Sequence, residues 1–192
     1  MIYGDNPIKV TDKLIRRELR RKKAYIKANG QLKQAKETGS TRHHRRKKRV
    51  QLCRARRRYH AAIRKSSNVM KDFHFKVAHD MLRGNRTIIL PKTSSHRWRT
   101  GAKLAGVCKR RIQKLSFGLF ASRLVQTSTM YSGSKIVRGS EAYTSKQCGQ
   151  CGKLNDKLGS SICFNCPTCG LQSDRDIHAA RNILLRFFSP LD

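Results

Sequence analysis

The sequence predicts an α-rich α+β fold, in which a long helical hairpin precedes short strands, further helices and a small cysteine-rich module. Apolar residues recur at spacings of three and four up to Gly84, as they do on one face of a helix. Two short β-branched runs follow, at Thr87 to Leu90 and at Lys135 to Val137. Two Cys-x-x-Cys pairs near the end of the chain indicate the separate module.

The first helix is predicted to start at Thr11, whose hydroxyl can cap it, and to carry Leu14 and Leu19 on its apolar face. It ends either near Gly30 or at the polar break from Thr38 to Ser40. The sequence alone does not decide between these two end points.

A second and longer helix is predicted between this break and Gly84. Apolar residues recur from Leu52 to Met81, and no proline or glycine interrupts them before Gly84. About forty helical residues span roughly 60 Å. The short polar turn between the helices predicts an antiparallel hairpin. Because its apolar stripe is thin and its outer faces are basic, we expect an arm that lies along a phosphate backbone.

Basic residues dominate the composition. The chain has 44 Lys and Arg against 11 Asp and Glu, which gives a net charge of +33. The charges of such a surface repel one another unless a polyanion neutralises them. A nucleic acid, in particular DNA, is therefore the predicted partner. The alternatives are a solvated basic face, an anionic membrane surface, or a nuclear-import signal at Arg45 to Arg49. A membrane role is disfavoured because the basic stretch lacks an inserting apolar face.

The middle of the chain is predicted to hold two helices, Ala102 to Gly118 and Phe120 to Met130. They follow a polar loop, Pro91 to Gly101, in which Trp98 either stacks on a base or plugs the edge of a core. A last amphipathic helix follows Asp176 and ends near residue 190.

The two Cys-x-x-Cys pairs are Cys148 with Cys151 and Cys166 with Cys169. Two such pairs this close in the sequence are typical of a site in which four thiolates surround one zinc ion. Gly152 and Gly170 follow the pairs and supply the positive φ that such a turn needs. Cys163 also stands three residues before Cys166, but no glycine follows that pair, so Cys163 is expected to be a spare thiol, with substitution for one of the ligands as the alternative. Four thiolates leave no open coordination position, so the zinc is predicted to be structural. The predicted ligands are Cys148, Cys151, Cys166 and Cys169.

Disulfides are the alternative for these cysteines, and they require an oxidising compartment. The N-terminus has no apolar signal region, no stretch is apolar and long enough to span a bilayer, and seven cysteines is an odd number. The sequence therefore predicts an intracellular protein, nuclear if its host is eukaryotic and cytoplasmic otherwise.

Acidic residues are rare after Asp80. Before the C-terminal Asp192 only four remain, and they are Glu141, Asp156, Asp174 and Asp176. Carboxylates at a strand end and at a helix start can hold Mg²⁺ against a phosphate. The alternative is that Ser173 and Asp176 form a capping box at the start of the last helix. Spacing alone does not decide between them.

The segment EAYTSKQCGQCG, with CPTCG and DRDIHAARNILLR, resembles the C-terminal zinc ribbon and last catalytic motif of TnpB/OrfB transposon-encoded nucleases, which are related to type V CRISPR effectors. More narrowly it resembles their Fanzor branch. The resemblance implies a ribbon inserted into a RuvC-like (RNase H-like) fold, in which three carboxylates bind Mg²⁺ and cut DNA directed by a guide RNA. It covers about Ile8 to Leu185, with specific motifs only from Glu141 to Arg186.

The resemblance places the last catalytic carboxylate at Asp176 and an alternative glutamate at Glu141. It expects an asparagine where this chain has His178, and another glutamate where it has Pro91 and Lys92. The family's first aspartate motif is missing, since Asp5 stands in a different context. We therefore expect a catalytically incomplete C-terminal fragment that binds zinc and nucleic acid, with an active Mg²⁺ endonuclease as the alternative. A full-length relative is a further candidate partner.

The expected division has four segments. Residues 1–84 form the basic hairpin, and 85–140 a partial RuvC-like region. Residues 141–175 form the zinc ribbon with its flanking acids, and 176–192 the last helix of the RuvC-like region.

Overall fold

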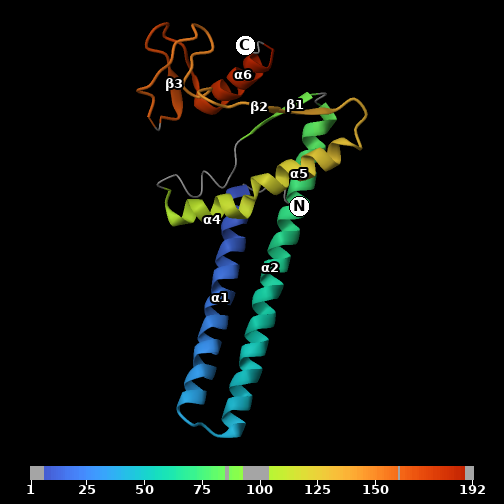
Figure 1. Cartoon of the computed structure of the whole chain (residues 1–192), viewed down its shortest axis with the longest axis vertical. Coiled ribbons are helices and arrows are strands. Elements are labelled where there is room, and N and C mark those ends of the chain that lie inside the picture. Colours follow the sequence, from blue (N-terminus) through green and yellow to red (C-terminus); the bar gives the residue numbers. More distant parts are fainter. Residues whose placement is uncertain (1–6, 85–86, 93–103, 160, 189–192) are drawn as a thin grey trace.

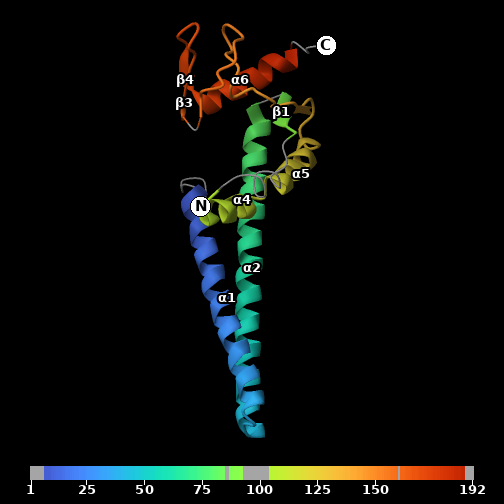
Figure 2. The same ribbon diagram turned by 60° about the vertical axis from the view of Figure 1, so that its left-hand side comes forward.

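The computed structural model describes residues 7–84, 87–92, 104–159 and 161–188. Two long helices form a rod, and the strands, the short helices and the cysteine-rich module gather at one end of it (Figures 1 and 2). The sequence expectations for Asp5, for the loop around Trp98 and for the end of the last helix near residue 190 lie outside the described residues. Among the described helices, none is long and apolar enough to cross a membrane.

The rod consists of α1 (Pro7–Glu37) and α2 (Arg42–Gly84). The first helix ends at the Thr38 to Ser40 break, where Gly39 adopts a φ of 65°, and not near Gly30. Thr11 does not cap the helix, so that prediction was wrong. The helix already starts at Pro7, because a first-turn residue needs no N–H partner and proline lacks that N–H. Thr11 is buried within it.

A narrow seam joins the two helices. The rings of Tyr25 and Tyr59 stack across it with centroids 5.9 Å apart, and Leu32 and Ala35 are buried nearer the turn. In α2 the buried side chains recur at every fourth position, and three of the six are small. The six residues are Ala62, Ser66, Met70, His74, Ala78 and Leu82. Most of the remaining surface of the rod is therefore left to its charged residues.

Helix α4 (Gly106–Leu115) crosses the start of α1 and is tied to it by two ion pairs. Arg111 donates two hydrogen bonds to Asp12, at 2.8 and 2.7 Å, and Lys114 donates one to Glu18 at 2.6 Å. The hydrogen bond from Arg111 lowers the pKa of Asp12 below its usual value. Two of the few acids in the chain are thus used to join α4 to the rod.

The predicted boundary between the two middle helices was three residues too late. Helix α4 ends at Leu115 and α5 runs from Phe117 to Ser128, so that Gly118 lies inside α5. The break is at Ser116, which adopts a left-handed conformation with a φ of 48°. Its hydroxyl donates a hydrogen bond to the carbonyl oxygen of Gln113, which helps a non-glycine residue to remain in that conformation.

A two-stranded parallel sheet lies at the end of α2. Strands β1 (Thr87–Pro91) and β2 (Lys135–Gly139) pair in register, with Ile88 opposite Ile136. Ile88 packs on one face of the sheet against Ala78 and Leu82 of α2 and Leu124 of α5. The next residue, Ile89, points to the other face, where α6 (Arg175–Phe188) contributes Ile183 beside Gly139. The sheet is therefore a thin middle layer between helices.

His74 fixes the corner where α2, α4 and α5 meet. Its Nε2 lies 2.8 Å from the carbonyl oxygen of Leu115, and Arg123 donates to its Nδ1 at 2.8 Å. These two contacts require a neutral ring with its proton on Nε2. Burial lowers the pKa of His74, and the charge of Arg123 lowers it further, against the opposing effect of the Leu115 carbonyl.

This arrangement predicts a pH-dependent stability. Because the folded-state pKa is lowered, the His74 contribution is complete above the unfolded value near 6.5 and is lost as the pH falls through the folded-state value. Between about pH 7.5 and 5, the urea midpoint should fall more for the wild type than for His74→Gln, measured by helical circular dichroism. His43→Ala, on an exposed residue, is the control and should keep the wild-type pH dependence. Equal pH dependence in the wild type and in His74→Gln would contradict this account.

Candidate metal centre

Two turns of the same construction present the four predicted cysteines. In the first, the amide of Gly152 donates to the carbonyl oxygen of Cys148 at 2.9 Å. In the second, Gly170 donates to Cys166 at 3.0 Å. Both glycines adopt a φ of 73°, a conformation that side chains disfavour. The closing-glycine pattern read from the sequence therefore corresponds to two matching knuckles.

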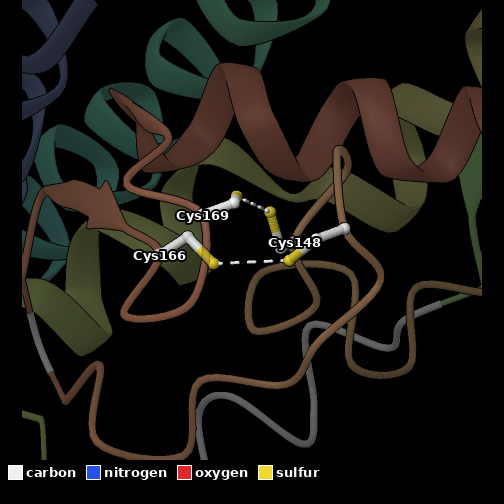
Figure 3. A group of neighbouring side chains, drawn as sticks. Cys148, Cys166 and Cys169 are labelled. Atoms are coloured by element: carbon white, nitrogen blue, oxygen red, sulfur yellow. Dashed lines mark hydrogen bonds between the residues drawn. The ribbon is translucent and has the colours of Figure 1, made fainter.

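The four sulfur atoms converge on one point. All lie within 4.8 Å of one another, with Sγ to Sγ distances of 3.6 Å between Cys148 and Cys169 and between Cys151 and Cys166. Figure 3 shows three of the side chains turned toward each other beside the last helix. Four thiolates held tetrahedrally at 2.3 Å from one zinc ion would stand about 3.8 Å apart. The donor set and its spacing thus fit a zinc ion.

Cys163 is not part of this cluster. It lies in β3 (Cys163–Asn165), which pairs antiparallel with β4 (Gln172–Asp174), and it is exposed. Among the described residues, the four cysteines form the only group of three or more His, Cys, Asp or Glu side chains close enough to share a metal ion.

The sulfurs influence one another's ionisation. Backbone amides of Cys169 and Thr168 point at the Cys166 sulfur and lower the pKa of that thiol to about 6, despite its burial. The amide of Leu171 acts in the same direction on Cys169, but burial and the other three cysteines raise the pKa of Cys169 to about 12. Close thiolates repel one another, and a bound cation removes that repulsion. The electrostatics therefore agree with a cation site.

Helix α6 holds the first knuckle through three polar side chains spaced four residues apart. They are His178, Asn182 and Arg186, and we call them the polar row. Asn182 donates from Nδ2 to the carbonyl oxygens of Thr144 and Gln147, at 2.8 and 2.7 Å. Arg186 donates to the carbonyl oxygen of Ala142 at 2.6 Å. Each bond goes to the turn that leads into Cys148, so the helix sets the position of the knuckle.

His178, the first residue of the polar row, contacts both the first knuckle and β3. Its ring stacks on Phe164 with centroids 4.0 Å apart and an interplanar angle of 12°. Nε2 lies 2.9 Å from the carbonyl oxygen of Gln147 and 3.3 Å from the amide nitrogen of Gly149. One nitrogen cannot donate to the first and accept from the second, and the shorter distance makes it the donor to Gln147. The sequence singled out His178 only as a departure from a motif and did not predict these contacts.

The capping box of Ser173 and Asp176, one of the two alternatives left open by the sequence, does not form at the start of α6. Asp174 caps the helix instead, because its Oδ1 accepts hydrogen bonds from the amides of Asp176 at 2.9 Å and Ile177 at 3.1 Å. Ser173 has a buried hydroxyl oxygen without a hydrogen-bond partner among the described residues. The side chain of Asp176 is thereby left exposed in the first turn of α6.

Glu141, the other predicted catalytic acid, follows the end of β2 and is half-buried. Its carbonyl oxygen accepts from the amide and the hydroxyl of Thr144, at 3.3 and 2.9 Å. Neither Glu141 nor Asp176 belongs to a group of three potential metal ligands within the described part of the chain.

Comparison with known proteins gives the family. Residues 117–183 match the Cas12f1-like TNB domain. TnpB-like protein L79 of Acanthamoeba polyphaga mimivirus is 37% identical over 140 residues, which are 72% of this chain and 26% of that protein. The putative transposase A625R of Paramecium bursaria Chlorella virus 1 is 34% identical over 128 residues, 66% of this chain and 28% of that protein.

A bacterial relative has a more specific name. A putative RNA-guided DNA endonuclease of Streptomyces pristinaespiralis is 30% identical over 113 residues, 59% of this chain and 27% of that protein. The chain thus spans about a quarter of the length of each of these relatives. The likeness includes the cysteine knuckles and most of α6, since both lie within the matched domain. Over the matched 72% of its length, the chain is therefore TnpB-like in sequence.

Proposed function

We propose that the chain binds nucleic acid, in particular DNA, through its hairpin, and that a structural zinc ion stabilises its zinc ribbon. The observation that carries the nucleic-acid proposal is the surface of α1 and α2, where basic side chains are exposed along the whole length of the rod. The name of the Streptomyces relative supports DNA and a guide RNA as ligands. A full-length relative remains a candidate partner.

Zinc is proposed from the donor set. Cys148, Cys151, Cys166 and Cys169 would hold the ion, and four sulfurs match the preference of zinc for thiolates in closed structural sites. Bound zinc would supply charge balance and a crosslink between the two knuckles. Reduced thiols at these positions suit an intracellular protein, in the nucleus if the host is eukaryotic.

The proposed division follows the sequence expectation. Residues 1–84 are the hairpin, 85–140 a partial RuvC-like region, 141–175 the zinc ribbon, and 176–192 the last helix of the RuvC-like region. The two-strand sheet covered by α2, α5 and α6 supports the middle part of this scheme. The Fanzor branch is the proposed subgroup of the family.

A second candidate function is Mg²⁺-dependent DNA cleavage with Glu141 and Asp176 as the catalytic acids. The exposed carboxylate of Asp176 favours it, because Asp174 and not Asp176 caps the helix. Two-metal cleavage needs carboxylates on both sides of the ions, and a strongly basic chain attracts Mg²⁺ poorly. We therefore propose that this chain alone is catalytically incomplete.

The zinc proposal predicts one equivalent of zinc per purified chain, measured by elemental analysis. A Cys148→Ser, Cys166→Ser double variant should lose the metal, because it removes one ligand from each knuckle. Cys163→Ser is the matched control and should keep one equivalent, since Cys163 lies outside the cluster. Zinc far below one equivalent in the wild type, or full zinc in the double variant, would refute the site.

The nucleic-acid proposal predicts binding that weakens steeply with salt. Fluorescence anisotropy with a labelled DNA duplex should give a slope of log affinity against log salt of about −4 or steeper, because each neutralised phosphate releases counterions. A peptide nucleic acid duplex of the same base sequence, which has an uncharged backbone, is the control and should not bind. A slope near zero with DNA would contradict the proposal.

The third prediction concerns cleavage. Incubated with supercoiled plasmid and Mg²⁺ or Mn²⁺, the chain alone should leave the DNA intact on an agarose gel, because the described carboxylates do not complete a two-metal site. If cleavage occurs, Glu141→Ala and Asp176→Ala decide its origin. Loss of cleavage in both, but not in the control Asp156→Ala, would show an active nuclease and overturn the proposed incompleteness. Cleavage that survives both substitutions would indicate a contaminating enzyme.

A further inference from the structure

Two hollows on the hairpin carry basic residues in their lining, which are all six of the described residues in one hollow and three of six in the other. The larger, of about 930 Å³, lies along one side of α1. The smaller, of about 310 Å³, lies between α1 and α2. The described residues lining the larger hollow are Lys9, Lys13, Arg16, Arg17, Arg20 and Arg21. Those lining the smaller one are Arg21, Ala24, Gln51, Arg54, Ala55 and Arg58. Arg21 lines both, so the two hollows meet at its side chain.

The spacing of these cations follows from the helix. Lys9, Lys13, Arg17 and Arg21 stand four residues apart, and four residues advance an α-helix by about 6 Å. Arg54 and Arg58 repeat the same step on α2. This repeat is close to the separation of successive phosphates along one nucleic-acid strand. A row of cations at this spacing can therefore meet a row of phosphates one to one.

The cations that line the two hollows form no ion pair among the described residues, although Arg16 lies close enough to Asp12 to lower the pKa of that carboxyl. Within the described part of the chain, no acidic side chain lines either hollow. A third hollow, of about 320 Å³, offers the contrast. There Glu18 and Lys114 both line the wall and pair with each other. The charge of that hollow is largely neutralised within the protein.

The chemistry of the two basic hollows selects the backbone of a nucleic acid over its bases. Among the described residues, the lining of both hollows contains no aromatic ring, the group on which bases stack. Guanidinium and ammonium groups contact phosphates without reading sequence. Apart from the cations, the described residues that line the two hollows are Ala24, Ala55 and Gln51.

We propose that the two hollows form one phosphate track, which seats the sugar-phosphate backbone of a single nucleic-acid strand and bends at Arg21. The proposal rests on the proposed nucleic-acid binding and adds the surface that performs it. Under this proposal the strand follows the α1 side of the rod and then passes between α1 and α2. The basic stretch at Arg45 to Arg49, beside the hairpin turn, is not part of the track.

The test compares two variants with equal loss of charge. The track variant carries Lys13→Gln, Arg17→Gln, Arg21→Gln and Arg54→Gln. The control variant carries Lys33→Gln, Arg49→Gln, Arg56→Gln and Arg64→Gln, which are exposed on the same two helices but line none of the three hollows. Each variant loses one lysine and three arginines. Circular dichroism and the melting temperature establish that both keep the wild-type helix.

Each protein is titrated by fluorescence anisotropy with labelled single-stranded DNA, duplex DNA and duplex RNA across a salt series. With duplex DNA, the track variant should show a salt slope shallower than the wild type by about three to four, because four phosphate contacts are lost. The control variant should change the slope by less than about one. The ligand with the largest difference between the variants identifies the form of the strand that occupies the track.

Three outcomes have different meanings. Equal loss in both variants, with tight binding by the wild type, would overturn the track and leave the proposed nucleic-acid binding standing. No salt-dependent binding by the wild type would overturn both.

If the track variant fails to fold, a variant with Arg17→Lys, Arg21→Lys and Arg54→Lys replaces it. Retention of charge predicts a wild-type salt slope for that variant, and a slope as shallow as that expected of the track variant would refute charge-based binding.

Discussion

Electrostatic self-repulsion is the constraint around which this fold is arranged. With 44 basic and 11 acidic residues, the chain must keep most of its charges apart or neutralise them with a polyanion. A long two-helix rod spreads the charge over a large surface. Two of the few acids, Asp12 and Glu18, join α1 to α4. Asp174 likewise caps the helix that supports the ribbon.

Main-chain carbonyl oxygens accept hydrogen bonds from basic side chains at several positions. Arg186 donates to Ala142, and Arg175 donates to Gly159 and Ser161. His74 and Asn182 also bond to carbonyl oxygens at the corners they hold. Such bonds satisfy buried or half-buried polar groups without adding negative charge. The elements of this basic chain are therefore tied together largely by side chain to main chain bonds.

Regular patterns in the sequence predicted the two long helices, both strands of the parallel sheet and the convergence of four of the seven cysteines. The repeat of apolar positions and the Cys-x-x-Cys-Gly spacing each depend on residues that are close in the sequence. Such patterns can be recognised without knowing which distant segments come into contact. The break at Ser116 was misplaced because a glycine nearby offered the stronger local signal, while the actual corner forms around His74. The polar row of α6 was missed because its partners are carbonyl oxygens, which carry no side-chain signature.

The continuity of α2 has a mechanical consequence. This single helix of 43 residues, about 65 Å long, runs without interruption from the hairpin turn to the layer beneath β1. Within the described part of the chain, the far end of α2 packs against α1 along the narrow seam, whereas its near end is packed into the core through Ala78 and Leu82. The hairpin therefore projects from the point where α4 contacts α1 and α5 contacts α2. A sideways force at its tip is transmitted as torque to the sheet, and through the sheet to the helix that carries Asp176.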